Sequence, residues 1–268
     1  MKNCKNRVLS WFALGLLVFL FLWGCSEDEN PVIDDTPDPV PANIFPLTPG
    51  HVLVYNSGTL LNLDTDVPIG GTENGFQSKW IIAGPVPGAG VPPYTTPTVI
   101  LDTTVVLGQT TLRTFAAHLE ETPNEFHFMT NLGYFFRSQK IYETPGDSTS
   151  GTKADSLIWI LLAKPSAGVG VEWIAFNETY TSAVVGEVRL EIKAEFEDTE
   201  TITAAGTDYL TYRLVATRRV YLGTSTTSIS TNPTAKLWMA DNVGPIQIEL
   251  RGDAESNGKR QTLTGKNF

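Results

Sequence analysis

A strict alternation of apolar and charged side chains over residues 188–197 constrains the fold of this chain more than any other feature. The segment reads Val-Arg-Leu-Glu-Ile-Lys-Ala-Glu-Phe-Glu, with apolar residues at even positions and charged residues at odd positions. Because successive side chains of a β-strand point to opposite faces, this pattern predicts a strand with one buried and one wet face. Half-buried strands of this kind are typical of antiparallel sheets.

Residues 210–222 and 246–251 repeat the alternation. Further strands are expected at residues 52–55, 77–83, 98–106, 110–120, 124–130, 133–139, 157–163, 172–177 and 235–240. Residues 157–162 are apolar on both faces, so we expect them to form the most buried strand. No window keeps a helical period beyond two turns, and we therefore expect an all-β, antiparallel fold.

One hairpin can be predicted together with its register. If residues 121–124 form a four-residue loop, Glu120 faces Glu125 and His118 faces His127. Directly opposed side chains have β-carbons about 5 Å apart, and imidazole nitrogens bind transition metals. The alternative is a polar pair without a ligand, since a third ligand is visible only as a choice among nearby glutamates. No metal is assigned, and His118 and His127 are kept as candidate ligands.

The first 24 residues have the features of an export signal. Basic residues at positions 2, 5 and 7 precede an apolar run over residues 8–23. This run is shorter than the about 20 residues that a membrane-spanning helix needs. Leu22-Trp23-Gly24-Cys25 resembles a bacterial lipobox, which implies that Cys25 is lipidated and becomes the first residue of the mature protein. Plain secretion and an uncleaved anchor are the alternatives.

Residues 25–44 are expected to form a disordered tether. Residues 26–44 include six acidic residues, four prolines and no basic residue, a composition that disfavours a packed core. Fully extended in polyproline geometry, at about 3.1 Å per residue, this stretch would reach about 60 Å. Acidic residues directly after a lipidated cysteine resemble the surface-export signal of lipoproteins from the Bacteroidota. That resemblance, together with Ser26, implies the outer membrane; a solvated spacer is the alternative.

Charge and cysteine content exclude several classes of function. The formal net charge of the 268-residue chain is −10, and removing the signal, which carries three basic and no acidic residues, leaves −13. A chain this acidic is repelled by nucleic acid, so we expect no nucleic-acid partner. The two cysteines are Cys4, in the signal, and Cys25. Residues 26–268 therefore offer no disulfide, zinc-thiolate site or cysteine nucleophile.

Three other motifs in the sequence lack the neighbouring residues that catalysis, calcium binding or receptor recognition would require. Residues 146–151 resemble a serine-nucleophile loop but lack the elbow spacing and an assignable histidine. Asp64, Asp66 and Glu73 do not complete a calcium loop. Arg251-Gly252-Asp253 is a tripeptide that adhesion receptors can read, and it is equally an ordinary polar turn.

The aromatic side chains either pack in the core or stack on sugars. The set consists of Trp80, Trp159, Trp173, Trp238, Tyr94, Tyr134, Tyr142 and Tyr180. Most lie within alternating apolar segments, which favours core packing. Tyr94 follows a Pro/Gly loop over residues 84–93 that cannot be strand interior. It is therefore the candidate for an exposed, ligand-binding aromatic residue.

Four short motifs occur in an order found in a known group of proteins. Residues 45–55 are similar to the Phe-Pro-Leu-x-x-Gly-x-x-Trp-x-Tyr start of many uncharacterised bacterial envelope lipoprotein domains, with Leu53 at the tryptophan position. Residues 168–173, 204–209 and 237–246 resemble three further marks of that group. The resemblance implies a strongly curved, half-barrel-like sheet, the architecture of lipoprotein carriers and receptors. A two-sheet β-sandwich is the alternative.

We therefore expect a lipoprotein signal over residues 1–24, a tether over 25–44 and a single all-β domain over 45–268. The expected function is that of a lipid-anchored, non-enzymatic outer-membrane protein, without a cofactor or catalytic residue, that binds or scaffolds an apolar ligand, a glycan or an envelope partner. A carboxylate-dependent hydrolase and a purely structural or adhesive surface module are the alternatives. A deep pocket on the inner face of the sheet would favour the ligand-binding function. A carboxylate pair in a cleft would favour the hydrolase, and an interior filled by side chains would favour the structural module.

Overall fold

The computed structural model describes residues 37–57, 60–62, 67–68, 76–106, 109–120, 124–131, 157–182, 186–251 and 257–268. Several sequence predictions lie outside these ranges. They are the signal, Cys25, the tether up to Thr36, the strand at 133–139, the calcium candidates Asp64, Asp66 and Glu73, Tyr134 and Tyr142, the serine loop at 146–151, and Gly252 and Asp253.

The described residues form strands that join in one antiparallel sheet. The strands are β1 (Val52–Ser57), β2 (Leu60–Asn62), β3 (Val67–Pro68), β4 (Phe76–Pro85), β5 (Thr98–Val106), β6 (Gln109–Glu120), β7 (Glu125–Asn131), β8 (Leu157–Ala163), β9 (Trp173–Ser182), β10 (Gly186–Ala204), β11 (Thr207–Leu222), β12 (Ser230–Ala240), β13 (Gly244–Arg251) and β14 (Asn257–Lys266). A short 3-10 turn, η2 (Pro165–Ala167), lies between β8 and β9. Within the ranges given above, no helix has both the length and the apolar character needed to cross a bilayer.

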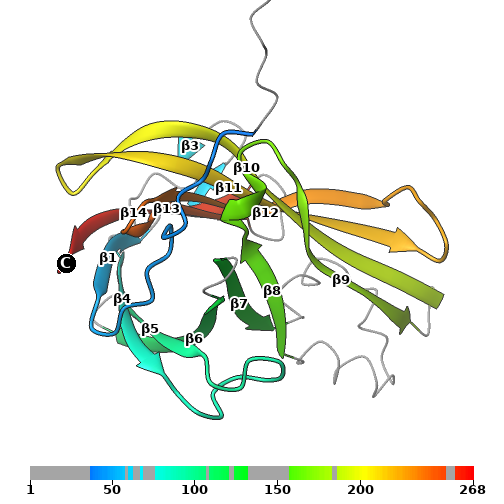
Figure 1. The fold of residues 1–268 in the computed structure, drawn as a ribbon, viewed down its shortest axis with the longest axis horizontal. Helices are drawn as coiled ribbons and strands as arrows, with labels where there is room; N and C mark the ends of the chain where they lie inside the picture. The colour runs from blue at the N-terminus through cyan, green and yellow to red at the C-terminus, as the bar shows by residue number, and fades with distance from the viewer. Residues whose placement is uncertain are drawn as a thin grey trace, which may run out of the picture. The chain divides into compact units, whose positions relative to one another are not determined.

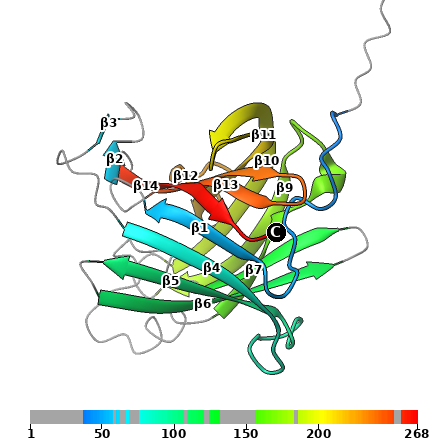
Figure 2. The same cartoon turned by 90° about the vertical axis from the view of Figure 1, so that its left-hand side faces the viewer.

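The sheet is nearly closed as a barrel. Its strand order is β8-β7-β6-β5-β4-β1-β14-β13-β12-β11-β10-β9, with β2 and β3 attached beside β14. The end strands β8 and β9 approach each other without a shared ladder and leave one unsealed seam (Figure 1). Figure 2 shows β1, β4, β5 and β6 side by side on one wall. The predicted all-β, antiparallel, curved sheet is confirmed, and it is one continuous sheet rather than a sandwich of two.

The long hairpin of β10 and β11 follows from the alternating pattern. Val188, Leu190 and Ile192 are fully buried on the inner face of β10. At the hairpin tip, Ala205 and Gly206 both have positive φ, at 49° and 75°. Two consecutive residues with positive φ form a type I′ turn, whose twist matches that of the flanking strands.

The prediction that residues 157–162 form the most buried strand is wrong. They form β8, which lies at one end of the sheet order, and Leu157 is 45% exposed. Its outer face is covered locally, since the indole Nε1 of Trp159 donates a hydrogen bond to the carbonyl of Val91 at 2.7 Å. An apolar segment can therefore be covered by a loop instead of by a second layer of structure.

The interior of the barrel is filled by side chains. One hydrophobic cluster joins the strap to residues from β4 through β12; its bulkiest buried members are Phe45, Phe126, Trp173, Tyr180 and Phe196. A second cluster gathers around Tyr55 and Ile246, near the tip of the β10–β11 hairpin. Close packing of large side chains stabilises the fold without disulfides.

The chain before β1 packs against the barrel over residues 37–45, which we call the strap. Ile44 and Phe45 are buried, and the Phe45 ring stacks on Phe126 with centroids 4.1 Å apart. The carbonyl of Asp38 accepts a hydrogen bond from the Val169 amide at 2.9 Å. The compact unit accordingly begins at Pro37, and residues 37–44, which the sequence analysis placed in the tether, belong to the β domain.

Candidate functional site

The β6–β7 hairpin has the register that the sequence predicts. His118 pairs with His127, and Glu120 pairs with Glu125. Asn124, at the end of the turn, has a φ of 66°, a left-handed conformation that asparagine tolerates better than most residues. Ala117 and Phe126 point into the core, so the alternation of the strands places the two histidines on the outer face.

The loop over residues 86–97, between β4 and β5, folds across this outer face. Two backbone hydrogen bonds close its base, from the Val86 amide to the Pro97 carbonyl and from the Gly88 amide to the Thr95 carbonyl. Gly90 is required by close approach, because a Cβ there would lie 2.2 Å from the backbone oxygen of Tyr94. The loop thereby brings Tyr94 onto the hairpin.

Tyr94 contacts both histidines. Its ring stacks on His118, with centroids 3.9 Å apart and an interplanar angle of 17°. Its hydroxyl lies 3.1 Å from His127 Nε2 and 3.4 Å from Glu120 Oε2, to which it donates a hydrogen bond. Tyr94 is half-buried by these contacts, in contrast to the exposed position expected from sequence.

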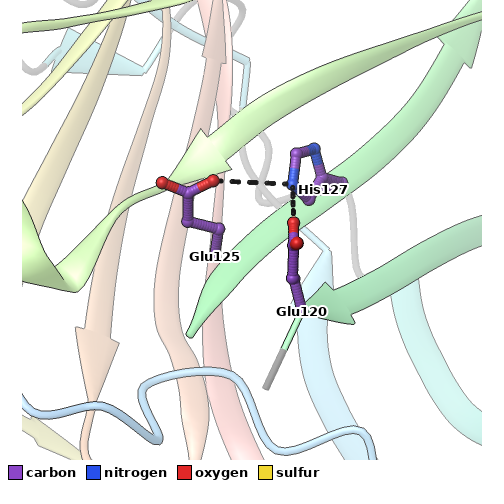
Figure 3. A group of neighbouring side chains, drawn as sticks. All are labelled: Glu120, Glu125 and His127. Atoms are coloured by element: carbon purple, nitrogen blue, oxygen red, sulfur yellow. Dashed lines mark ion pairs between the residues drawn. The ribbon is translucent and has the colours of Figure 1, made fainter. Parts of the chain in front are cut away.

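Two carboxylates converge on the imidazole of His127 (Figure 3). His127 Nε2 is 3.7 Å from Glu120 Oε2 and 4.0 Å from Glu125 Oε2. The other oxygen of Glu125 pairs with Lys164 Nζ at 3.2 Å. The side chains of His127 and Glu125 are 13% and 15% exposed, whereas Glu120 is 45% exposed. The cluster is therefore shielded on the sheet side and reachable from solvent past Glu120.

The surroundings shift the protonation of this cluster. Burial lowers the pKa of His127 below its usual range, although Glu125 and Glu120 act in the opposite direction. Burial also lowers the pKa of His118, against Glu120. The pKa of Tyr94 is raised by burial and by the charges of Glu120 and Glu125. Near pH 7 both imidazoles are accordingly neutral, and the Tyr94 phenol keeps its proton.

The structure joins candidates that the sequence analysis left separate. His118, His127 and Tyr94 form one contact group, although only His127 has its ring nitrogen beside the two glutamates. Lys164 was missed, because nothing in its local sequence indicates that it meets Glu125. The lipidation candidate, Cys25, lies outside the described residues.

The remaining aromatic candidates pack as core residues do. Trp173, Trp238 and Tyr180 are buried, and Trp80 and Trp159 are half-buried. Trp159 packs edge-on against Tyr94, with ring centroids 5.3 Å apart. These contacts favour a packing role over a platform for sugars.

A shallow hollow of about 350 Å³ lies beside the strap. It is lined by the strap, by residues 165–168 after β8 and by Asn124 at the β6–β7 turn. Neither Glu120 nor Glu125 lines it, so this hollow does not place a substrate beside the two carboxylates.

Comparisons with known proteins give remote structural likenesses. No protein-family model matches the chain, and no curated protein matches it. The crystal structure of a "putative lipoprotein" from Parabacteroides distasonis is 15% identical, with a TM-score of 0.45, and covers 86% of this chain and 100% of that chain. A "putative exported protein with YmcC-like fold" from Bacteroides fragilis is 12% identical, with a TM-score of 0.39, and covers 85% and 100%.

Proposed function

We propose that this chain is a non-enzymatic, lipid-anchored protein of the bacterial outer membrane that scaffolds an envelope partner through the outside of its barrel. The lipobox-like segment ending at Cys25 and the acidic stretch after it support the location. The packed interior of the barrel supports contact with a partner on its outer surface rather than inside it.

By the criterion set from the sequence, the filled core favours a structural module over a binder of an internal ligand, and it is the observation that carries the scaffold proposal. Side chains from the strap and from opposite walls of the barrel meet in one cluster. A carrier of an apolar molecule needs an apolar cavity of several hundred Å³ that encloses most of its ligand. The shallow hollow beside the strap does not enclose a ligand in this way. A glycan or a protein partner on the outer surface fits this packing better than an apolar ligand inside it.

The strap limits how far the domain reaches from its anchor. Because the compact unit begins at Pro37, about 12 residues separate it from Cys25, and a stretch of that length would reach about 40 Å if it were fully extended. A scaffold on a tether of this length acts close to the membrane surface.

A carboxylate-dependent hydrolase is the second candidate, and the Glu120–Glu125 pair is the observation that favours it. Paired carboxylates cleave glycosidic bonds when one of them donates a proton to the leaving group. In this chain Glu125 is held by Lys164, and the pair lies on the outer face of a hairpin. These contacts favour the scaffold.

Three measurements test the proposal. The intact mass of the mature protein should correspond to a chain that begins at an acylated Cys25, and Cys25→Ala should release the folded domain from sedimenting membranes. Native mass spectrometry of the detergent-extracted protein should detect no retained apolar ligand. A stoichiometric lipid-like mass released only on unfolding would overturn the scaffold in favour of a carrier. Membrane sedimentation of Cys25→Ala would place the anchor elsewhere.

A further inference from the structure

We propose that Glu120, Glu125 and His127 form a binding site for one divalent transition-metal cation, of the Zn²⁺ type. One ligand atom from each residue lies within 4.8 Å of the other two. Figure 3 shows both carboxylates directed toward the imidazole. This site goes beyond the proposed scaffold function and does not depend on it.

The spacing of the three atoms fits a single cation after a small adjustment. With Zn–N and Zn–O bonds of about 2.0–2.2 Å, neighbouring ligands of a tetrahedral site lie about 3.4 Å apart. The distances from His127 Nε2 to Glu120 Oε2 and Glu125 Oε2 are 3.7 and 4.0 Å. Small rotations of both glutamate side chains would close these differences, because the 4.0 Å distance joins His127 to Glu125 and the 3.7 Å distance joins it to Glu120.

The donor set selects the class of cation. One imidazole nitrogen with two carboxylate oxygens suits zinc and its neighbours in the first transition row. Calcium takes six to eight oxygen ligands, and magnesium keeps an octahedral oxygen shell. An imidazole-containing group with three protein ligands fits neither of these hard cations.

The hairpin holds the ligands before any cation arrives. Glu120 and Glu125 are directly opposed in the β6–β7 register, and His127 lies two residues beyond Glu125 on the same strand. Lys164 fixes the orientation of Glu125 by binding its far oxygen, leaving the near oxygen directed at His127. Partners commonly orient metal ligands in natural sites, but here the positive charge of Lys164 also opposes a cation bound by Glu125.

Tyr94 adds a fourth potential donor atom, its hydroxyl oxygen, beside the same point. Its hydroxyl is 3.1 Å from His127 Nε2 and 3.4 Å from Glu120 Oε2. A cation held by the three ligands therefore contacts this phenol oxygen or a water in its place. Coordination through Tyr94 would join the loop over residues 86–97 to the sheet and stabilise the folded chain.

The charges around the site favour a dication. Tyr94 and His118 face it from the loop and from β6, Glu120 and Glu125 from the hairpin, and Lys164 from the segment after β8. The two carboxylates outweigh the one lysine, which leaves a net negative environment. His118 is excluded as a ligand because its ring is stacked under Tyr94 and lies 6.4 Å, centroid to centroid, from His127.

Zinc titration of the full chain in detergent, after dialysis against EDTA, tests the site. Isothermal calorimetry with ZnCl₂ should give one cation per chain, and zinc should raise the midpoint of thermal unfolding. Both Glu120→Gln and His127→Phe should weaken zinc binding by about tenfold or more. Glu120 is partly exposed, so Glu120→Gln tests the site even if His127→Phe fails to fold.

The matched control is His118→Phe, which keeps a ring stacked on Tyr94 and removes the other imidazole. It should bind zinc with an affinity within about twofold of the unmodified chain, because His118 is not one of the three ligands and the phenyl ring preserves its stacking on Tyr94. Absence of zinc binding by the unmodified chain would overturn the proposal. Binding that survives both Glu120→Gln and His127→Phe, or that is lost in His118→Phe, would also overturn it.

Discussion

The indole Nε1 of Trp173 on β9 donates a hydrogen bond to the carbonyl oxygen of Leu161 on β8, at 3.0 Å. These strands are the two ends of the sheet. The Trp173 ring also packs against Phe196, with centroids 5.4 Å apart. A single side chain thus links the edges of the seam and contributes to the core beneath it.

Replacing Trp173 should separate these two contributions. Trp173→Phe keeps an aromatic ring and removes the donor, so we expect a loss of about 1 kcal/mol in the free energy of unfolding. Trp173→Ala also removes the ring and should cost about 3–5 kcal/mol. Urea denaturation followed by far-UV circular dichroism measures both. Equal losses for the two variants would show that the hydrogen bond across the seam is the dominant contact.

The strap should contribute to stability as core residues do. Ile44 is 1% exposed, and Ile44→Ala should lower the free energy of unfolding by about 2–5 kcal/mol through cavity formation. Thr48→Ala, at an exposed position shortly after the strap, should change it by no more than about 0.5 kcal/mol. The same urea titration measures the free energy of unfolding of both variants. If Ile44→Ala leaves it unchanged, residues 37–44 do not contribute to the core and belong with the tether.

Glu195 should make the fold slightly less stable as the pH rises. Burial, followed by repulsion from Glu197 and Glu172, raises the pKa of this carboxyl above its ordinary value of 4.5. The folded chain therefore holds the proton more tightly than the unfolded chain, and the associated stability is lost as the pH rises from about 4.5 through the raised pKa. Because Glu195 is only partly buried, solvent screens these interactions and the effect is small.

The corresponding variant is Glu195→Gln. Its thermal midpoint should exceed that of the unmodified chain at pH 7, and the advantage should shrink at pH 4. Glu187→Gln, at an exposed position of the same strand, controls for the change from glutamate to glutamine. An advantage for Glu195→Gln that grows on acidification would contradict the raised pKa.

Lys164 should weaken binding at the proposed metal site. Its ammonium lies 3.2 Å from Glu125 Oε1 and repels a cation bound by that carboxylate. Lys164→Met should therefore raise the affinity for Zn²⁺ severalfold in calorimetric titrations, most clearly at low salt. Lys193→Met, which removes a lysine paired with Glu172 elsewhere on the barrel, should leave the affinity unchanged. Weaker binding by Lys164→Met would show that orientation of Glu125 outweighs repulsion.

Local patterns in the sequence predicted most of the described strands and one complete register, although β14 (Asn257–Lys266), between β1 and β13, was missed. The pairing of Glu120 with Glu125 followed from counting outward from a four-residue turn, because hairpin register depends only on nearby residues. The alternation at residues 188–197 correctly identified the buried face of β10, where Val188 and Leu190 are fully buried. In both cases the deciding interactions lie within one or two neighbouring strands.

Contacts between distant segments could not be predicted in this way. Tyr94 reaches His127 because the loop over residues 86–97 folds across β6, β7 and β8, and no periodicity encodes that path. Val40 and Ile44 are isolated apolar residues in a proline-rich, acidic stretch, and their burial depends on a surface built by strands far along the chain. The position of β8 at the end of the sheet depends likewise on global strand order.

The strap is also the first part of the described domain that a pulling force on the N-terminal side of the chain would reach. If the chain is anchored at Cys25 as proposed, a force pulling the anchor away from the barrel would reach the described domain first at Pro37 and at the hydrogen bond between the Asp38 carbonyl and the Val169 amide. Farther along the strap, the Asn242 amide donates a hydrogen bond to the carbonyl of Asn43, and the Phe45 ring stacks on Phe126. Residues 37–45 would therefore carry such a force before it reaches β1.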